Sequence, residues 1–239
     1  MRKFSKFGAI AVLASSLVSS AAANWYDGVF VGIEGKYNIK SKFETKWTEN
    51  TAPFMMNFNI DDSAFGLGLK VGYDFDLWRI YGAYNYNPKI KDNAKNFALI
   101  TSYTDENFEY STNDFILGAD WTPKFSMFGL DFKGALGAFA GISKIDVKYH
   151  TFDTLSSADV SSDYSQDGFI YGLKLGAIYD FDKFGEVEFG IKFDSAKYDD
   201  KDALLSGIDS YGSDVAYKTK ISDTKRTNTG VFVGYNYKF

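Results

Sequence analysis

Few side chains in this sequence are suited to catalysis. The chain has one histidine, His150, and no cysteine. His150 lies in the segment Tyr149-His-Thr-Phe-Asp153, where Asp153 is close enough in sequence to orient an imidazole. A nucleophilic mechanism also needs a hydroxyl or thiol held against that imidazole, and the position two residues after the histidine is Phe152. We therefore expect His150 to be a solvated residue of a connecting segment, and the protein not to be an enzyme.

Two acidic segments offer oxygen ligands for a metal ion. One contains Asp159, Asp163 and Asp167, and the other contains Asp199, Asp200 and Asp202. Calcium prefers oxygen ligands, but its recognisable binding loop has a fixed spacing that closes with a glutamate. Neither segment has that spacing. The sequence therefore predicts hydrated carboxylates, with no metal site and no cofactor.

A third set of charged residues is more regular, because its members alternate with apolar residues. A period of two places successive side chains on opposite faces of a strand. Charges of both signs on one face can form a salt-bridged network, or they can line a narrow path for ions. The candidates for this charge network are Glu34, Lys36, Lys70, Arg79, Asp114, Asp120, Lys133, Lys174, Glu188 and Lys192.

Eight segments carry this alternation and must position these charges. They cover residues 29–38, 65–75, 78–87, 114–121, 130–142, 169–180, 186–194 and 230–239. The composition of 18% aromatic residues, 22 glycines and 3 prolines is typical of strands. Short connections at 74–78, 121–130 and 180–186 alternate with long polar ones at 40–63, 88–110, 150–166 and 195–228. This alternation of short and long connections predicts an all-β fold, an eight-stranded antiparallel up-and-down transmembrane β-barrel with long outer loops.

The two faces of these segments differ in a way that indicates their surroundings. One face is almost wholly apolar, whereas the other mixes glycine, alanine and charged residues. A soluble barrel such as a lipocalin would place its apolar face inside. Glycine and charge would make a poor dry core, because an unpaired buried charge costs several kcal/mol. We therefore expect the apolar face to contact lipid. An aromatic girdle is predicted at one set of strand ends from Trp25, Trp78, Trp121 and Phe239, and a second at the opposite ends from Tyr37, Tyr86, Tyr149 and Phe169.

The amino-terminal segment has the features of a secretory signal peptide. Basic residues at 2, 3 and 6 precede an apolar stretch at 7–18 and small residues at 19–23. We expect cleavage after Ala23, which leaves a barrel domain at 24–239 with both termini in the periplasm. The net charge of −5 argues against nucleic acid as a partner.

The final strand alternates from Val231 to Phe239 and ends in Gly234-x-x-Tyr237-x-Phe239. Together with the eight alternating segments, this ending resembles the small eight-stranded outer-membrane β-barrel family, the OmpA-like and opacity-type barrels of the porin-like superfamily. The resemblance implies a location in the Gram-negative outer membrane. It also implies that Gly234, Tyr237 and Phe239 form the signal recognised by the outer-membrane assembly machinery. Enzymes of this architecture rely on a histidine, and His150 lacks the neighbouring serine of the deacylases.

Two functions remain open. The first is a non-enzymatic structural or surface-interaction barrel, and the alternative is a minor porin-like channel for small solutes or ions. Expected partners are outer-membrane lipid and lipopolysaccharide, the assembly machinery and, through the loops, host or cell-surface ligands. Basic residues that could bridge lipopolysaccharide phosphates are Lys40, Lys42, Lys46, Lys218, Lys220, Lys225 and Arg226. The first loop offers apolar anchors for a partner, unless they pack against their own neighbours: Trp47, Phe54, Met55, Met56 and Phe58.

Overall fold

The computed structural model describes residues 28–49, 55–93, 104–127, 129–153, 158–181, 185–208 and 211–239. These residues form ten strands: β1 (Val29–Glu49), β2 (Met55–Asp74), β3 (Trp78–Asn93), β4 (Thr104–Trp121), β5 (Lys124–Met127), β6 (Leu130–Asp153), β7 (Ala158–Asp180), β8 (Glu186–Tyr198), β9 (Lys201–Ile208) and β10 (Asp214–Lys238). Within the described ranges, no helix is long and apolar enough to cross a membrane.

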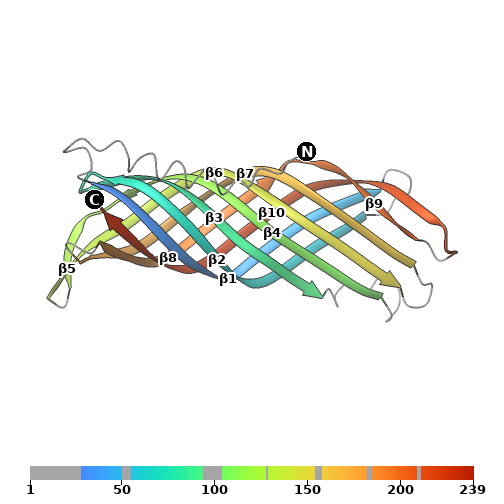
Figure 1. The fold of residues 1–239 in the computed structure, drawn as a ribbon, viewed down its shortest axis with the longest axis horizontal. Coiled ribbons are helices and arrows are strands. Elements are labelled where there is room, and N and C mark those ends of the chain that lie inside the picture. Colours follow the sequence, from blue (N-terminus) through green and yellow to red (C-terminus); the bar gives the residue numbers. More distant parts are fainter. Residues whose placement is uncertain are drawn as a thin grey trace.

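Eight of these strands close into a ring (Figure 1). The ring runs through β1, β2, β3, β4, β6, β7, β8 and β10, and the pairing of β10 with β1 closes it. All pairs are antiparallel, and each strand pairs with the next long strand along the chain. The prediction of an eight-stranded antiparallel up-and-down barrel is therefore confirmed.

The two remaining strands are continuations of strands in the ring. After Pro123, β5 takes up the pairing of β4 with β6, and after Asp200, β9 takes up the pairing of β8 with β10. The β5–β6 hairpin lies at the same end of the barrel as the C-terminus, and β9 lies at the other end (Figure 1).

Most residues predicted to form long loops belong to strands instead. The pairing of β1 with β2 extends from Val29–Tyr73 to Thr48–Met55, and that of β6 with β7 extends to Asp153–Ala158. The predicted loops at 40–63, 88–110, 150–166 and 195–228 were therefore wrong over most of their described length. The connecting residues 50–54, 94–103, 154–157 and 209–210 lie outside the described residues.

The loops were misread because side-chain polarity inverts along the barrel. On β6, Leu136 and Ile142 point outward and are 53% and 65% exposed, whereas Ile145 and Val147 further along point inward and are buried. The outward neighbour Lys148 is polar and exposed. We call the part with the apolar outer face the belt section, which includes residues 29–39, 65–73, 78–86, 115–121, 132–142, 169–179, 187–193 and 230–237. The part beyond it, with a polar outer face, is the extension.

A β-bulge in β1 lies at the boundary between the two parts. The register against both neighbouring strands shifts after Asn38. Before the shift the even-numbered residues, such as Lys36, point into the barrel, and after it the odd-numbered residues Ser41 and Phe43 do so. The bulge inserts residues without opening the wall, so the interior remains continuous from the belt section into the extension.

Candidate functional site

The candidate site is the interior of the barrel, where the structure gathers most of the predicted charge network. Nine of the ten predicted charges are buried: Glu34, Lys36, Lys70, Arg79, Asp114, Asp120, Lys174, Glu188 and Lys192. The tenth, Lys133, lies at the mouth next to the β2–β3 turn, with its ammonium 3.3 Å from Asp74 and its side chain 15% exposed. The alternation of the strands accounts for this placement, because each charge faces away from the apolar outer surface.

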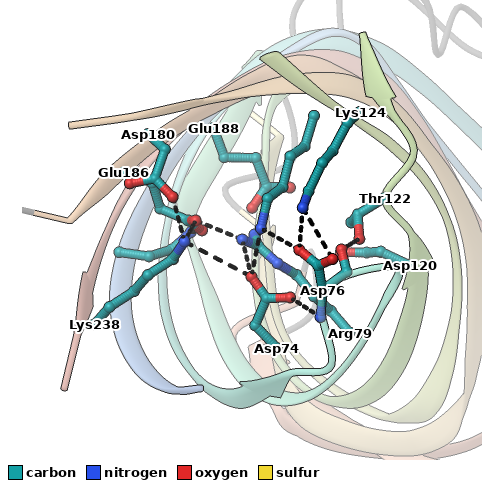
Figure 2. A network of polar contacts seen from close by, with 12 residues as sticks. Asp74, Asp76, Arg79, Asp120, Thr122, Lys124, Asp180, Glu186, Glu188 and Lys238 are labelled. Atoms are coloured by element: carbon teal, nitrogen blue, oxygen red, sulfur yellow. Dashed lines mark hydrogen bonds and ion pairs between the residues drawn. The ribbon is translucent and has the colours of Figure 1, made fainter. Parts of the chain in front are cut away.

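A cluster of ion pairs fills the mouth at the C-terminal end (Figure 2). Arg79 on β3 contacts Glu186 on β8 and lies 2.9 Å from Asp74. Lys238 on β10 reaches the same Glu186 at 2.8 Å and Asp180 at 2.7 Å. These pairs connect β2, β3, β7, β8 and β10, so they hold the closing strand against its neighbours.

The middle of the interior is organised around Glu188. Its carboxylate lies 2.6 Å from the ammonium of Lys70 and 2.7 Å from that of Lys174. Lys174 also donates a hydrogen bond to Asp120 at 2.6 Å. A Cβ at Gly137 would collide with the Asp120 carboxylate, so the glycine makes room for this charge. The result is a chain of alternating charges that links four strands.

Aromatic rings fill the space between these charges. The ammonium of Lys174 lies 4.7 Å from the ring centroid of Tyr81, and that of Lys192 lies 5.0 Å from that of Phe232. Lys192 also forms an ion pair with Glu34. Cation–π contacts at such distances are attractive, and more so when water is excluded. Side chains thus fill the interior of the belt section instead of surrounding an open cavity.

The upper end of the network lies near the start of the extension. Arg226 donates a hydrogen bond to Asp114 at 2.9 Å and pairs with Asp194 at 3.4 Å. Asn228 donates a hydrogen bond to Asp194 at 2.7 Å, and Lys36 lies 3.7 Å from it.

Above the charges, the interior of the extension is an aromatic core. The rings of Phe43 and Tyr110 stack with centroids 5.0 Å apart, and Phe43 lies 5.5 Å from Phe108. Further out, Trp47 meets Tyr149 at 5.1 Å. The prediction that Tyr149 belongs to an outer girdle was therefore wrong, because Tyr149 is 4% exposed and points inward.

This aromatic core includes one of the apolar anchors that were predicted in the first loop. Trp47 is 3% exposed, and its ring lies 5.8 Å from that of Tyr164. Burial raises the pKa of the Tyr164 hydroxyl above its ordinary value. Trp47 is thus a core residue of the extension, as the alternative interpretation allowed. The side chains of Met55, Met56 and Phe58, and the whole of Phe54, lie outside the described part.

Several network residues were absent from the prediction. Glu186 and Asp194 stand on the same alternating face as Glu188, so the pattern contained the signal for them. Arg226 was assigned to an outer loop and to lipopolysaccharide, and that assignment was wrong because Arg226 is 1% exposed and lies inside the barrel. Its alternation with the outward Lys225 could have revealed it.

Of the remaining predicted aromatic and assembly residues, four lie at the C-terminal end of the barrel: Trp78, Trp121, Tyr237 and Phe239. Trp78 and Trp121 are paired across β3 and β4 and are 56% and 43% exposed, and Phe239 is 44% exposed. Trp25 and the predicted signal peptide lie outside the described residues. Tyr237 is also exposed on the outer face, whereas Gly234 faces the interior between β1 and β8.

His150 lies on the outer surface of the extension. Its Nε2 is 2.9 Å from Asp159 Oδ1, and both side chains are about half exposed, at 48% and 52%. The partner that the structure describes is thus Asp159 of β7, and the side chain of the predicted Asp153 lies outside the described part. The acidic segments also meet lysines, with Asp163 3.3 Å from Lys148. Among the described residues, no three acidic or histidine side chains are grouped so that they could hold a metal ion.

The surface lysines proposed for lipopolysaccharide have acidic neighbours. Lys40 lies 3.2 Å from Asp61, and Lys46 lies 2.9 Å from Asp223. Lys42 and Lys220 are paired in the same way, with Glu44 and Asp200. The hydrogen bond between Lys46 and Asp223 raises the pKa of the lysine and lowers that of the carboxyl group. This surface therefore carries less free positive charge than its lysine content indicates.

Comparison with known proteins identifies the fold. No protein-family model and no curated protein matches the chain in sequence. In structure, it is similar to a major outer membrane protein from Thermus thermophilus, with 11% identity, coverage of 87% of this chain and 99% of that one, and a TM-score of 0.50. The fold is that of an outer-membrane β-barrel. The fold-level resemblance predicted from the sequence is thereby confirmed.

Two further solved structures are also similar to this chain. Ail, the attachment invasion locus protein of Yersinia pestis, is 14% identical, with coverage of 88% and 99% and a TM-score of 0.41. The outer membrane protease OmpT from Escherichia coli is 9% identical, with coverage of 91% and 99% and a TM-score of 0.38. A fold alone does not determine function, so function must be argued from the interior and the surfaces of this chain.

Proposed function

We propose that this chain is a structural or surface-interaction barrel of a bacterial outer membrane, with a closed interior and no enzymatic activity. The belt section supports the membrane location, because side chains such as Leu117 and Ile142 are 75% and 65% exposed. A continuous apolar ring of this kind is unfavourable in water and suits the hydrocarbon of a bilayer. The proposal includes a cleaved signal peptide at 1–23.

The observation that carries the proposal is the filling of the interior at two levels. An eight-stranded barrel is just wide enough to be filled by its own side chains. Here buried ion pairs centred on Glu188 occupy the belt section, those of Arg226 lie near the start of the extension, and rings such as Phe43 and Trp47 fill the extension above them. A solute would have to displace both layers, so a scaffold is favoured over an open pore.

The orientation follows from the two ends of the barrel. The extension needs water on its outer face, and it lies opposite the end that holds the C-terminus and the β2–β3 turn (Figure 1). Tight turns are typical of the periplasmic side of such barrels, and long structures are typical of the outside. We therefore place both termini in the periplasm and the extension outside the cell.

The absence of enzymatic activity is supported by the position of the only histidine. His150 and Asp159 stand half exposed on the outer wall of the extension. Acid–base and nucleophilic catalysis need groups held in a site that excludes water. A half-exposed pair on the surface of a sheet is open to water and does not meet this requirement.

Surface contact is supported by the outer hairpin formed by β9 and β10. Leu204, Ile208 and Tyr211 are 53%, 45% and 91% exposed there, beyond the belt section. Exposed apolar side chains at an outer tip are suited to a cell-surface ligand. Replacing all three by serine should reduce attachment of cells that display the barrel, whereas equal attachment would count against this hairpin as the contact.

Lipopolysaccharide remains a proposed partner of the outer lysines. Six of them stay on the surface: Lys40, Lys42, Lys46, Lys218, Lys220 and Lys225. Neutralising these six should weaken lipopolysaccharide binding if their ion pairs open toward phosphate groups. Unchanged binding would exclude lipopolysaccharide as a partner of these lysines.

The decisive experiment is single-channel recording of the refolded barrel in planar bilayers. A closed interior predicts a silent bilayer, provided that heat-modifiable gel mobility shows the protein to be folded. Discrete conductance steps that change when Lys70 or Arg79 is neutralised would overturn the closed interior and favour the channel.

The porin-like alternative has one observation in its favour. Several buried polar atoms of the interior have no hydrogen-bond partner within the described protein, namely Arg79 Nε and Nη1, Asp120 Oδ1, Asn236 Oδ1, Asn87 Oδ1 and Arg226 Nε. Buried polar groups usually find a partner in protein or water. Because these atoms are spread along the network, they could support a thin file of water that conducts ions.

A further inference from the structure

The β5–β6 hairpin, at the C-terminal end of the barrel, is amphipathic along its whole length. Its four residue pairs are Lys124–Lys133, Phe125–Phe132, Ser126–Asp131 and Met127–Leu130. Opposite residues of an antiparallel pair share a face. One face is therefore made of Phe125, Met127, Leu130 and Phe132, and the other of Lys124, Ser126, Asp131 and Lys133.

The apolar face of the hairpin is exposed. Phe125 is 41% exposed, and Met127 and Leu130 are each 47% exposed. Phe125 stacks on Phe132 with ring centroids 5.8 Å apart, which leaves the outer side of the pair uncovered. Exposure of adjoining apolar side chains to water is unfavourable, so such a face indicates a contact surface.

This face is continuous with the belt section. Trp121, the last residue of β4, pairs with Leu136 of β6, and both side chains point outward. The hairpin extends beyond this pair on the same side of the wall, at the end that holds the C-terminus (Figure 1). Four residues of strand add about 13 Å to the apolar surface. Continuity with the lipid-facing belt favours lipid as the occupant of the face.

The rest of the hairpin requires water nearby. Lys124 and Lys133 contact Asp76 in the β2–β3 turn, at 2.8 and 3.7 Å. Among the described residues, β5 pairs with β6 alone, which leaves its other edge open. Open strand edges are not tolerated in hydrocarbon. An element with one apolar face, one polar face and an open edge is suited to the boundary between acyl chains and water.

We propose that the β5–β6 hairpin is an interfacial anchor that rests on the periplasmic leaflet, with Phe125, Met127 and Leu130 against phospholipid. The inference depends on the proposed function, since it requires the belt section to lie in a membrane. It adds an asymmetric contact on one side of the barrel, which sets the depth and the tilt of the protein in the bilayer.

The experiment uses site-directed spin labels, because a chain without cysteine accepts one label at a chosen position. The variants are Phe125→Cys and Met127→Cys on the apolar face, Ser126→Cys on the polar face and Leu117→Cys in the belt section as the membrane control. Each is refolded into phosphatidylethanolamine–phosphatidylglycerol vesicles and checked by heat-modifiable mobility. Collisions of each label are measured with oxygen, which enters lipid, and with a water-soluble nickel chelate.

The anchor predicts that labels at 125 and 127 collide severalfold more with oxygen than with nickel, as the label at 117 does, and that the label at 126 shows the reverse. Met127→Cys leaves the Phe125–Phe132 stack intact, so it provides the test if Phe125→Cys does not fold. Labels at 125 and 127 that resemble 126, while 117 stays in lipid, would overturn the anchor, because they would show that lipid does not cover this face. Nickel access at 117 as well would overturn the membrane location itself.

Discussion

Replacing Glu188 by glutamine should lower the free energy of unfolding by about 3–5 kcal/mol, the cost of breaking a buried ion pair by removing one partner. Glu188 is fully buried and lies 2.6 Å from Lys70 and 2.7 Å from Lys174. Glutamine keeps the shape of the side chain, so the loss would reflect charge rather than packing. The prediction tests directly whether the interior of the belt section is dry.

The magnitude follows from what each lysine retains. Lys174 keeps Asp120 at 2.6 Å, so its charge remains compensated. Lys70 loses the carboxylate at 2.6 Å, and its side chain is 3% exposed. One buried ammonium thus loses its ion pair rather than two, which places the expected loss near the lower end, at about 3 kcal/mol.

The assay is urea unfolding of the barrel in lipid vesicles, followed by tryptophan fluorescence. Asp163→Asn provides a matched control, because Asp163 pairs with Lys148 at 3.3 Å while both side chains are more than half exposed, at 67% and 59%. An exposed pair of this kind contributes less than about 1 kcal/mol. The control should therefore leave the midpoint almost unchanged.

A loss below about 1 kcal/mol for Glu188→Gln would refute the reasoning, because only pairs that water can reach are worth so little. That result would strengthen the channel alternative. The double variant Lys70→Met/Glu188→Leu offers a second check. Apolar replacement of both partners is often neutral, so the double variant should be more stable than the single one. Equal or lower stability would contradict a dry interior.

Other predictions concern the core, the closing strand and the surface. Phe43→Ala should cost about 3–5 kcal/mol in the same urea assay by leaving a cavity, whereas Ile39→Ala, at a side chain 63% exposed on the belt section, should cost far less. Phe239→Ser should reduce the heat-modifiable barrel recovered from cells while leaving refolding into detergent unchanged; equal recovery would remove Phe239 from the assembly signal. The hydrogen bond from Lys46 holds the pKa of Asp223 below its ordinary value, so the stability that this pair adds is present above the pKa of the unfolded state and is lost as the pH falls through the folded-state pKa. Lys46→Met should therefore raise the pKa of Asp223 in a carboxyl NMR titration, and an unchanged titration would exclude the pair as the cause.

The belt section could be predicted from the sequence because every strand there has an apolar outer face and an inner face that carries polar and small residues. Apolar residues such as Leu67, Leu117 and Val233 alternate with interior residues, so a period of two assigned each face correctly. The closure of the strands into a ring was also predictable, because short connections that alternate with long ones indicate that strands adjacent in the sequence pair with each other.

The extension was missed because its alternation has the opposite polarity. Lys144, Asp146 and Lys148 on β6 lie beyond the end of the predicted strand at 130–142, although Ile145 and Val147 between them form part of the interior. Polar residues that dominate a segment mask its periodicity when only apolar runs are sought. The same pattern would identify such strands if both polarities were considered.

Membership of the charge network was predictable, but the pairing was not. The face of Glu188 follows from alternation alone, whereas its bonds to Lys70 and Lys174 depend on which strands lie opposite each other across the ring. Sequence periodicity contains no information on that distance. Arg226 pairs with Asp114 for the same reason, from strands that are far apart in the chain.

The change from a charged to an aromatic interior follows from what surrounds each part of the barrel. In the belt section, lipid outside is as apolar as a packed core, so moving a phenylalanine inward would gain little. Polar groups distinguish inside from outside there, because only the interior can satisfy them. Around the extension water takes the place of lipid, and burial of Phe43 and Trp47 becomes favourable. The extension should therefore gain its stability from hydrophobic burial, as a soluble barrel does, whereas the belt section should depend on every buried charge keeping a partner, so a change that weakens one part need not loosen the other.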